Sequence, residues 1–382
     1  MLILRQVAAV VVLACAVCGA EAQPEEGGFK RDYLDPLLSG SCPQGARPRE
    51  PDAIDIRVAQ VPLQMLNPMR KTIGQLSFVG GFHLTSKDKR FGGLSGLDLL
   101  DDGRLLAASD AGDFVWIALD DEGTTPVSAS IAGMSDRDGQ SLRGKARGDA
   151  EGLAVMDGMA LVSFEGDHRV LAFGVGQCGA DARGVPVALE AGGLPAAMAR
   201  QSINAGGNGG VEALAVAPGW FMMAGVESKA GDASAVSVRA LEAAPEFDIR
   251  IGEGAPGVVG LDLIPNAVGD GGFTAYSLHR STRALASEVI VLVETRFERG
   301  LDPSNLPARI TREMDERSRV RFRPVASRKL AAMNPLVTMD NFEGVAARRM
   351  PDGRVRLYIV SDDNFSASQR TLLMIFEVAD PG

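Results

Sequence analysis

Short stretches in which apolar and polar residues alternate dominate the chain from about residue 54 onward. The alternation is clear at 54–58 and again at 355–359, near the C-terminus. Other short apolar runs, such as 105–108 and 160–163, are bounded by Gly and Asp. A period of two between turn residues is typical of β-strands, so the chain is expected to be mostly β.

One short unit recurs five times, and in each copy a small or acidic residue opens a compact apolar strand. The copies are Gly96–Leu99, Glu151–Val155, Glu212–Val216, Gly260–Leu263 and Glu343–Ala346. In four of them a tight turn and a returning strand follow. The turns are Asp102-Gly103, Asp157-Gly158, Pro218-Gly219 and Asp352-Gly353, and the returning strands end on Asp110, Glu165, Glu227 and Asp362. Because hairpin strands run antiparallel, the opening residue and the closing acid are expected at the same end.

The spacing of the five units fits four-stranded blades joined by loops of variable length, which favours an all-β β-propeller. Six blades are expected, with the sixth built from strands at 54–63, 76–84 and 372–378, and five blades are the alternative. A two-sheet sandwich would also give short alternating strands, but it does not require an acid-opened unit to recur.

The first 22 residues are expected to be a cleaved secretory signal peptide. Arg5 precedes an apolar run at 7–17 that is too short to span a bilayer, and Ala20-Glu21-Ala22 suits signal peptidase. The alternative is a lipoprotein anchored at Cys15, because Val12-Leu13-Ala14-Cys15 loosely resembles a lipobox. Residues 23–53, rich in Gly, Pro and charge, are expected to form an irregular arm before a propeller domain at 54–382. The predicted location is periplasmic or secreted, with no transmembrane span.

The amino-acid composition limits the kinds of partner and the side chains that can take part in catalysis or binding. The 382 residues include 39 Lys and Arg against 49 Asp and Glu, for a net charge of −10, so a nucleic-acid partner is not expected. Aromatic residues make up 5% of the chain and there are three His, so carboxylates must carry most of the polar chemistry.

Two cysteines, Cys42 and Cys178, remain after removal of the signal peptide. In an oxidising compartment they would either form one disulfide that ties the arm to the domain or stay as separate thiols, and the sequence leaves both open.

Several segments resemble the phytase-like family described as "esterase-like activity of phytase". They are Phe91–Leu97, Asp149–Leu153, Asn341–Val345 and above all Ser361–Phe365 followed by Gln369-Arg370-Thr371. The similarity extends over about residues 75–380. It implies a secreted β-propeller, and the name of the family suggests hydrolysis of an ester or phosphoester.

The opening glutamates Glu151, Glu212 and Glu343 are expected to converge at one mouth of the central channel. Neighbouring carboxylates stay ionised together only when a cation compensates them, and hard oxygen ligands suit Ca²⁺. The candidate ligands are these three glutamates with Asp110, Glu165, Asp362 and Asn364. The competing interpretation is that the acids cap strand turns by accepting hydrogen bonds from backbone N–H groups.

A cation held there would activate water for attack on a phosphate or carboxylic ester, with a free Glu or Asp as base. Glu151, Glu343, Arg280 and Arg370 are the candidate catalytic residues. Either arginine would clamp an anionic substrate, or instead neutralise the acidic channel in buried ion pairs. A serine nucleophile is not favoured, because the sequence around Ser95 lacks the Gly-x-Ser-x-Gly elbow.

Two classes of function remain. One is a metal-dependent extracytoplasmic hydrolase of a small-molecule ester, lactone or phosphoester. The other is a non-catalytic propeller that binds a ligand or protein and uses calcium for structure. Hydrolysis of inositol hexakisphosphate is disfavoured, because a chain of net charge −10 offers that anion little without several bridging cations.

Overall fold

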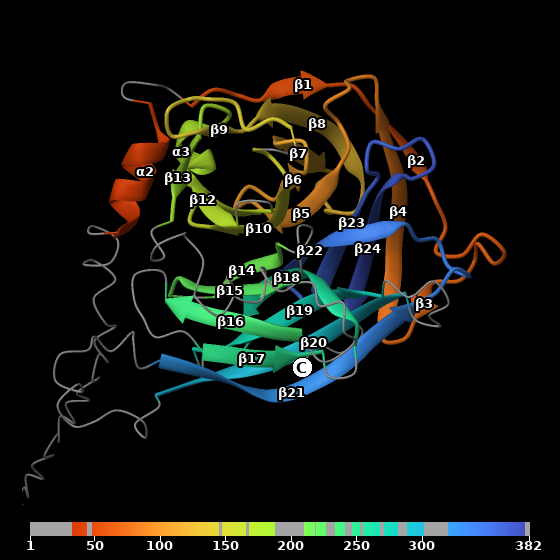
Figure 1. Ribbon diagram of the computed structural model, residues 1–382. Coiled ribbons are helices and arrows are strands. Elements are labelled where there is room, and N and C mark those ends of the chain that lie inside the picture. The colour runs from red at the N-terminus through yellow and green to blue at the C-terminus, as the bar shows by residue number, and fades with distance from the viewer. Residues whose placement is uncertain are drawn as a thin grey trace, which may run out of the picture.

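The computed structural model describes residues 33–43, 48–144, 147–165, 168–187, 210–217, 219–226, 234–240, 247–252, 255–267, 271–281, 289–301 and 320–378. Almost all of the regular structure in these ranges is β, in five sheets. Figure 1 shows the sheets arranged around the centre of the molecule. The predicted all-β propeller is therefore confirmed.

The first three blades follow one another along the chain. Blade 1 has the order β1-β8-β7-β6-β5 and contains β1 (Asp52–Ile54), β5 (Leu94–Leu99), β6 (Leu105–Ser109), β7 (Asp113–Leu119) and β8 (Pro126–Gly133). Blade 2 contains β10 (Ala150–Met156), β11 (Met159–Phe164), β12 (Arg169–Phe173), β13 (Arg183–Pro186) and β9 (Ser135–Asp136). Blade 3 contains β14 (Val211–Ala217), β15 (Phe221–Val226), β16 (Ser234–Ala240) and β17 (Phe247–Ile251).

The last two blades close the ring. Blade 4 contains β18 (Gly257–Pro265), β19 (Phe273–Arg280), β20 (Ile290–Leu301) and β21 (Val320–Met333). Blade 5 contains β22 (Asn341–Arg349), β23 (Val355–Asp362), β24 (Thr371–Val378), β4 (Leu76–Ser86), β2 (Ile56–Gln60) and β3 (Thr72–Ile73). Each inner strand contacts the next in the cycle β5, β10, β14, β18, β22 and back to β5.

The described residues contain five sheets, so the expectation of six blades is corrected. The strands assigned to a sixth blade belong to blade 5, where β24 pairs with β23 and β4 pairs with β24 from Thr371↔Leu84 to Val378↔Leu76. Without β4, the last strand of the chain would leave an open edge of unpaired backbone groups. Pairing the two ends of the domain in one sheet satisfies that edge and closes the ring.

Glycine allows neighbouring inner strands to approach closely around the axis. A Cβ atom on Gly152 would lie 2.7 Å from the Cβ of Leu214 in blade 3, and one on Gly344 would lie 2.8 Å from the Cβ of Leu97 in blade 1. These distances are shorter than any contact of a real Cβ atom. The inner strands can therefore pack this closely only with a glycine at this position of the repeat.

The segment expected to be an irregular arm contains the helix α2 (Asp35–Ser41), with Pro36 and acidic Asp35 in its first turn. Both residues favour a helix start. Residues 1–32 and 44–47 lie outside the described residues, and so does the expected signal peptide.

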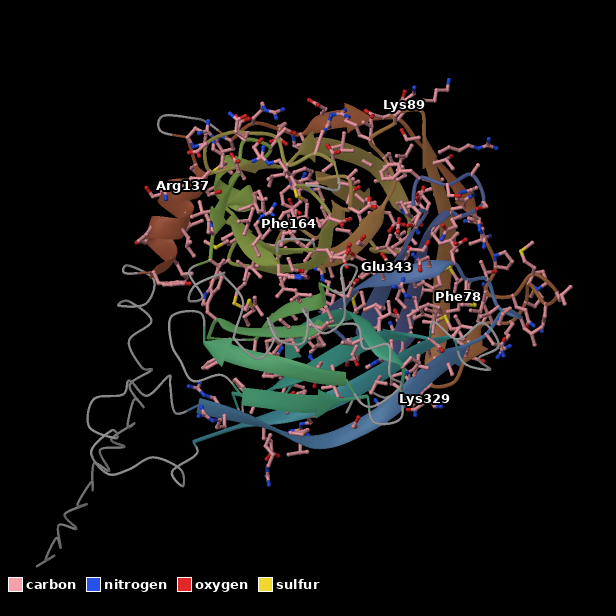
Figure 2. All side chains as sticks on the ribbon, in the orientation of Figure 1. Phe78, Lys89, Arg137, Phe164, Lys329 and Glu343 are labelled. Atoms are coloured by element: carbon pink, nitrogen blue, oxygen red, sulfur yellow. A yellow bond between two sulfur atoms is a disulfide. The ribbon has the colours of Figure 1, made fainter. Side chains whose placement is uncertain are left out.

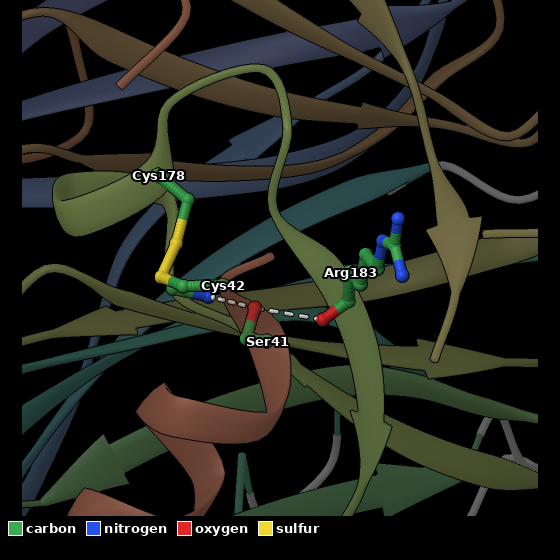
Figure 3. The surroundings of a disulfide bond; sticks show 5 residues. Ser41, Cys42, Cys178 and Arg183 are labelled. Atoms are coloured by element: carbon green, nitrogen blue, oxygen red, sulfur yellow. Dashed lines mark hydrogen bonds between the residues drawn. A yellow bond between two sulfur atoms is a disulfide. The ribbon is translucent and has the colours of Figure 1, made fainter. Parts of the chain in front are cut away.

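A disulfide joins Cys42, which follows α2, to Cys178 at the end of α3 (Val175–Cys178), with a Cα–Cα distance of 5.6 Å (Figure 3). Ser41 donates a hydrogen bond through Oγ to the carbonyl oxygen of Arg183 in β13 at 2.7 Å. The bond and the helix thus fasten the segment before the propeller to blade 2. Within the described residues, no helix is long and apolar enough to cross a membrane.

Candidate functional site: an acidic ring at the channel mouth

Each inner strand carries a β-bulge near its start, and the bulged positions correspond around the ring. The pairing of each inner strand with its neighbour shifts there in all five blades. The residues at the shift are Ser95, Glu151, Glu212, Val259 and Glu343. A bulge turns a side chain out of the regular pleat and is common beside functional sites. Three of the five bulged positions therefore present a glutamate.

These glutamates surround the axis. Glu212 and Glu343 line a cavity of about 10 Å³ between the inner strands, together with Ser95 and Val259. That volume holds about one water molecule. Figure 2 shows Glu343 toward the centre of the molecule, whereas Lys89 and Lys329 lie on its periphery.

Carboxylates from blades 2, 3 and 5 repel Glu151. Burial raises the pKa of Glu151 well above its usual range, and the neighbouring carboxylates Glu212, Glu343, Glu165 and Asp149 raise it further. The three bulged glutamates thus lie close enough to interact electrostatically, although they come from three blades.

Blade 2 brings three acids together. Asp149 and Glu151 lie at the start of β10 and Glu165 directly follows β11, and one carboxylate oxygen from each lies within 4.8 Å of the others. The hairpin register explains this, because the backbone N–H of Glu165 donates to the carbonyl oxygen of Asp149 at 2.8 Å. We call Asp149, Glu151 and Glu165 the blade 2 acidic triad.

Blade 5 places a different set of side chains at the corresponding positions. Asn341 and Glu343 lie at the start of β22 and Asp362 ends β23. The Asn341 Nδ2 donates to Glu343 Oε1 at 2.8 Å and lies 3.5 Å from Asp362 Oδ2. We call Asn341, Glu343 and Asp362 the blade 5 triad.

Arg280 supplies a cation to the blade 5 triad. Its Nη1 donates to Asn341 Oδ1 at 2.5 Å and forms an ion pair with Glu343 Oε1. Arg280 ends β19 at the position that corresponds to Asp110 in blade 1 and Glu165 in blade 2, where those returning strands end on an acid. Blade 4 thus carries a guanidinium where blades 1, 2 and 5 carry the carboxylates of Asp110, Glu165 and Asp362.

The other predicted site residues lie in varied surroundings. Burial, together with repulsion from Glu343 and Asp110, raises the pKa of Asp362 to about 7. Asn364 is exposed, and its backbone N–H donates to Asp362 at 2.6 Å. Arg370 donates through Nε to Asp340 at 3.1 Å and through Nη2 to the carbonyl oxygen of Met339 at 2.9 Å. The predicted acid Glu227 lies outside the described residues.

Two further buried acids lie deeper along the inner strands and have a structural role. Asp98 in β5 accepts hydrogen bonds from the backbone N–H groups of Leu99 and Val155, and Asp262 in β18 accepts from Leu263 and Ala347. Each carboxyl therefore connects its own inner strand to that of the next blade. Burial raises the pKa of Asp98 to about 7.

Sequence reasoning missed Asp149 and Asn341. Both precede the apolar part of an inner strand, two positions before a bulged glutamate. The pattern Asp/Asn-x-Glu-Gly at Asp149–Gly152 and Asn341–Gly344 is the signal that could have identified them.

The family model described as "Phytase-like: Esterase-like activity of phytase" matches residues 89–365, which is more than half of the chain. The chain belongs to this phytase-like family. The matched residues extend from the loop before β5 to the end of the Ser361–Phe365 segment, so they include both triads and Arg280. No curated protein matches the sequence.

Several solved structures show distant likeness to the phytase-like chain. Glutaminyl cyclase from Myxococcus xanthus is 11% identical, covers 87% of this chain and 100% of its own, and gives a TM-score of 0.37. PQQ-bound aldose sugar dehydrogenase from Streptomyces coelicolor is 12% identical, covers 86% and 99%, and gives 0.39. The PQQ domain of pyranose dehydrogenase from Coprinopsis cinerea is 10% identical, covers 87% and 99%, and gives 0.36. These likenesses are too distant to indicate an activity.

Proposed function

We propose that the protein is an extracytoplasmic, metal-assisted hydrolase of an ester or phosphoester, with Ca²⁺ bound by the blade 2 acidic triad. The observation that carries the proposal is the approach of three carboxylate oxygens, from Asp149, Glu151 and Glu165, within 4.8 Å of one another. Their closest electrostatic neighbours include two further carboxylates, Glu212 and Glu343, which repel Glu151. Such a group stays ionised at neutral pH when a cation compensates its charge.

The donor set fits calcium. Ca²⁺ binds six to eight oxygen ligands at about 2.3–2.6 Å, so two ligands on opposite sides of one ion lie at most about 4.6–5.2 Å apart. The spread of the triad oxygens falls within this limit. All three carboxylates are partly exposed, which also suits an ion that completes its shell with water or substrate. When bound, the cation supplies Lewis-acid polarisation of a phosphoryl or carbonyl oxygen.

Asp362 and Arg280 have properties that suit the remaining roles. A carboxyl whose pKa lies near neutrality accepts a proton efficiently in the transition state, and the pKa of Asp362 is raised to about 7. Glu343 and Asn341 hold the Arg280 guanidinium at the mouth, where it would stabilise negative charge on the substrate. Arg370 is engaged with Asp340 and Met339, so we assign it to the conformation of that loop.

The test is turnover of ester, lactone and phosphate substrates by the purified chain with and without Ca²⁺. Glu151→Gln keeps the shape of the side chain and removes one ligand charge, so it should lower kcat/KM by about a hundredfold or more. Glu122→Gln, which removes an exposed charge from a turn in blade 1, is the matched control and should leave kcat/KM unchanged. Absence of turnover on every substrate class, or equal turnover in Glu151→Gln, would refute the hydrolase.

A binding propeller with structural calcium is the second candidate. The position of the blade 2 acidic triad favours it, because an ion held there would join the start of β10 to the residue after β11 and stabilise that hairpin. For this function, removal of Ca²⁺ should lower the melting temperature while no substrate class is turned over. The two candidates are therefore separated by the same set of experiments.

The proposed location is the periplasm or the extracellular space. The disulfide between Cys42 and Cys178 is compatible with an oxidising compartment. Cleavage after Ala22, detected by mass spectrometry of the secreted chain, would test the expected signal peptide.

A further inference from the structure

A hollow of about 480 Å³ lies between the loop that joins β2 to β3 and the segment that joins β21 to β22. Its walls are mostly apolar, with Met65 from the loop, Val289 before β20, and Val337 and Met339 after β21. Sites for small molecules commonly have volumes of about 300–1,000 Å³ and predominantly apolar walls. The hollow, which we call the apolar hollow, is therefore large enough for part of a small ligand.

Hydrogen bonds between neighbouring segments fix the shape of the apolar hollow. Thr338 donates through its backbone N–H to the carbonyl oxygen of Leu63 at 2.8 Å and through Oγ1 to that of Pro62 at 2.6 Å. The N–H of Val289 donates to the carbonyl oxygen of Met333 at 2.9 Å. Because these bonds hold the walls in place before a ligand arrives, binding costs less conformational entropy.

The polar side chains in the walls of the apolar hollow have partners within the protein. Arg370 donates through Nε to the carboxylate of Asp340 at 3.1 Å, so these two charges compensate each other. The hydroxyl of Thr338 is engaged with Pro62. Met65 is 67% exposed, and a hydrocarbon chain in the hollow would cover part of its surface. The walls therefore favour a hydrocarbon chain over a sugar or a phosphate, whose polar groups need hydrogen-bond partners.

One end of the apolar hollow adjoins the candidate functional site. Asp340, which lines the hollow, directly precedes Asn341 of the blade 5 triad. The carbonyl oxygen of Val289 accepts a hydrogen bond at 2.8 Å from the N–H of Ser281, which directly follows Arg280. Since consecutive Cα atoms are about 3.8 Å apart, the hollow begins close to Arg280 and Asn341. A substrate held at the channel mouth can thus extend a chain into the hollow.

We propose that the apolar hollow binds an unbranched hydrocarbon chain of the substrate, which makes the substrate a carboxylic ester with a medium-length chain. The inference rests on the proposed hydrolase, with the ester group beside Arg280 and Asp362. Hydrolysis breaks the bond between the acyl carbon and the alcohol oxygen, joins the water oxygen to that carbon and passes one proton of the water to the alcohol. The chain belongs to the acyl group or to the alcohol, and the substrates chosen for the test distinguish the two.

Hydrolysis of 4-nitrophenyl esters from acetate to decanoate tests the acyl chain, and decyl acetate beside ethyl acetate tests the alcohol. In one of the two series, each CH₂ group that the hollow covers should raise kcat/KM of the wild type by about fourfold. Met65→Asp places a charge in an apolar wall and should lower kcat/KM for the long-chain ester by about tenfold or more, with the short-chain ester unchanged within about twofold. Met69→Asp is the matched control, because Met69 lies in the same loop, is 82% exposed and does not line the hollow.

Binding of decanoate and of 1-decanol, measured by isothermal titration calorimetry, gives a readout that needs no turnover. The wild type and Met69→Asp should bind one of the two, and Met65→Asp should bind it about tenfold more weakly. Binding without turnover of any ester would support the hollow as a chain site and refute the hydrolase. Turnover that does not depend on chain length, or equal affinity in Met65→Asp and the wild type, would overturn the inference and leave the hydrolase standing. Dimers that Met65→Asp dissociates, seen by analytical ultracentrifugation, would also overturn it by making the hollow a contact between copies.

Discussion

Blade 2 and blade 5 place corresponding side chains at the channel mouth, but these side chains carry different charges. In blade 5, Arg280 from the preceding blade forms an ion pair with Glu343, and Asn341 is a neutral bridge. In blade 2, Asp149 stands where blade 5 has Asn341, and the preceding blade offers Asp110 at the position of Arg280. Arg280 supplies a cation to the blade 5 triad, and we propose that Ca²⁺ serves the blade 2 acidic triad, whose three carboxylate oxygens lie within 4.8 Å of one another.

The largest expected effect comes from removing the internal cation. Arg280→Gln leaves Glu343, which is 8% exposed, buried without its counter-charge. Breaking one side of a buried ion pair should lower the free energy of unfolding by about 3 kcal/mol, measured by denaturant titration. Arg104→Gln, at an arginine whose ion pair with Asp102 is exposed (side chains 36% and 50%), should cost less than about 1 kcal/mol. Equal losses in the two variants would contradict the role of Arg280.

A double variant should convert blade 5 into a copy of blade 2. Arg280→Gln with Asn341→Asp removes the internal cation and adds the missing carboxylate. We expect Ca²⁺ to restore most of the stability lost in Arg280→Gln, and the number of bound calcium ions to rise by one. Thermal unfolding with and without Ca²⁺ measures this, and a double variant that Ca²⁺ does not stabilise would break the comparison.

The pH dependence of stability should reverse with calcium. Because the pKa of Glu151 is higher in the folded chain than its ordinary value, the folded state holds the proton more tightly. In a chelator, the stabilisation that comes from protonated Glu151 is fully present below the ordinary pKa of Glu. It is lost as the pH rises through the higher pKa that Glu151 has in the folded chain. Ca²⁺ must displace that proton, so its stabilisation should grow over the same rise in pH.

Melting temperatures from pH 5 to pH 8, in chelator and in Ca²⁺, test this expectation, and Glu151→Gln should flatten the chelator curve. The predicted direction is wrong if, in chelator, the wild type becomes more stable from pH 5 to pH 8 and Glu151→Gln does not.

The smallest effect is expected at Asn364. Its side chain is exposed and its φ of 47° is one that Gly adopts readily, so Asn364→Gly should leave calcium affinity unchanged within about twofold. Isothermal titration would show whether Asn364 belongs to the cation site, because a large loss of affinity would place it there.

Much of the fold was predictable because its signals are local. The Gly-containing turns after the inner strands fix hairpin register, and Gly103, Gly158, Gly219 and Gly353 all have the positive φ that these turns favour. Register alone places Glu151 and Glu165 at one end of blade 2. The expected association of 76–84 with 372–378 in one blade is confirmed. The expected blade number was wrong because β24 also pairs with β23, so these strands extend the sheet of the fifth unit and do not form a sixth.

The pairing of charges in the site could not be predicted from the sequence either. Arg280 is the last residue of β19, which has no closing acid, and only the pairing register shows that the arginine takes the place of one. The disulfide needed the distance between Cys42 and Cys178. Asp98 and Asp262 stand in the repeat as visibly as the glutamates, yet their carboxyls accept backbone hydrogen bonds from the next blade.

Calcium binding to the chelator-treated chain, measured by isothermal titration calorimetry beside Glu151→Gln and Glu122→Gln, tests the central claim most directly. The account predicts one calcium site in the wild type and in Glu122→Gln, and an affinity about a hundredfold or more lower in Glu151→Gln. Absence of binding in the wild type, or equal affinity in all three proteins, would contradict it.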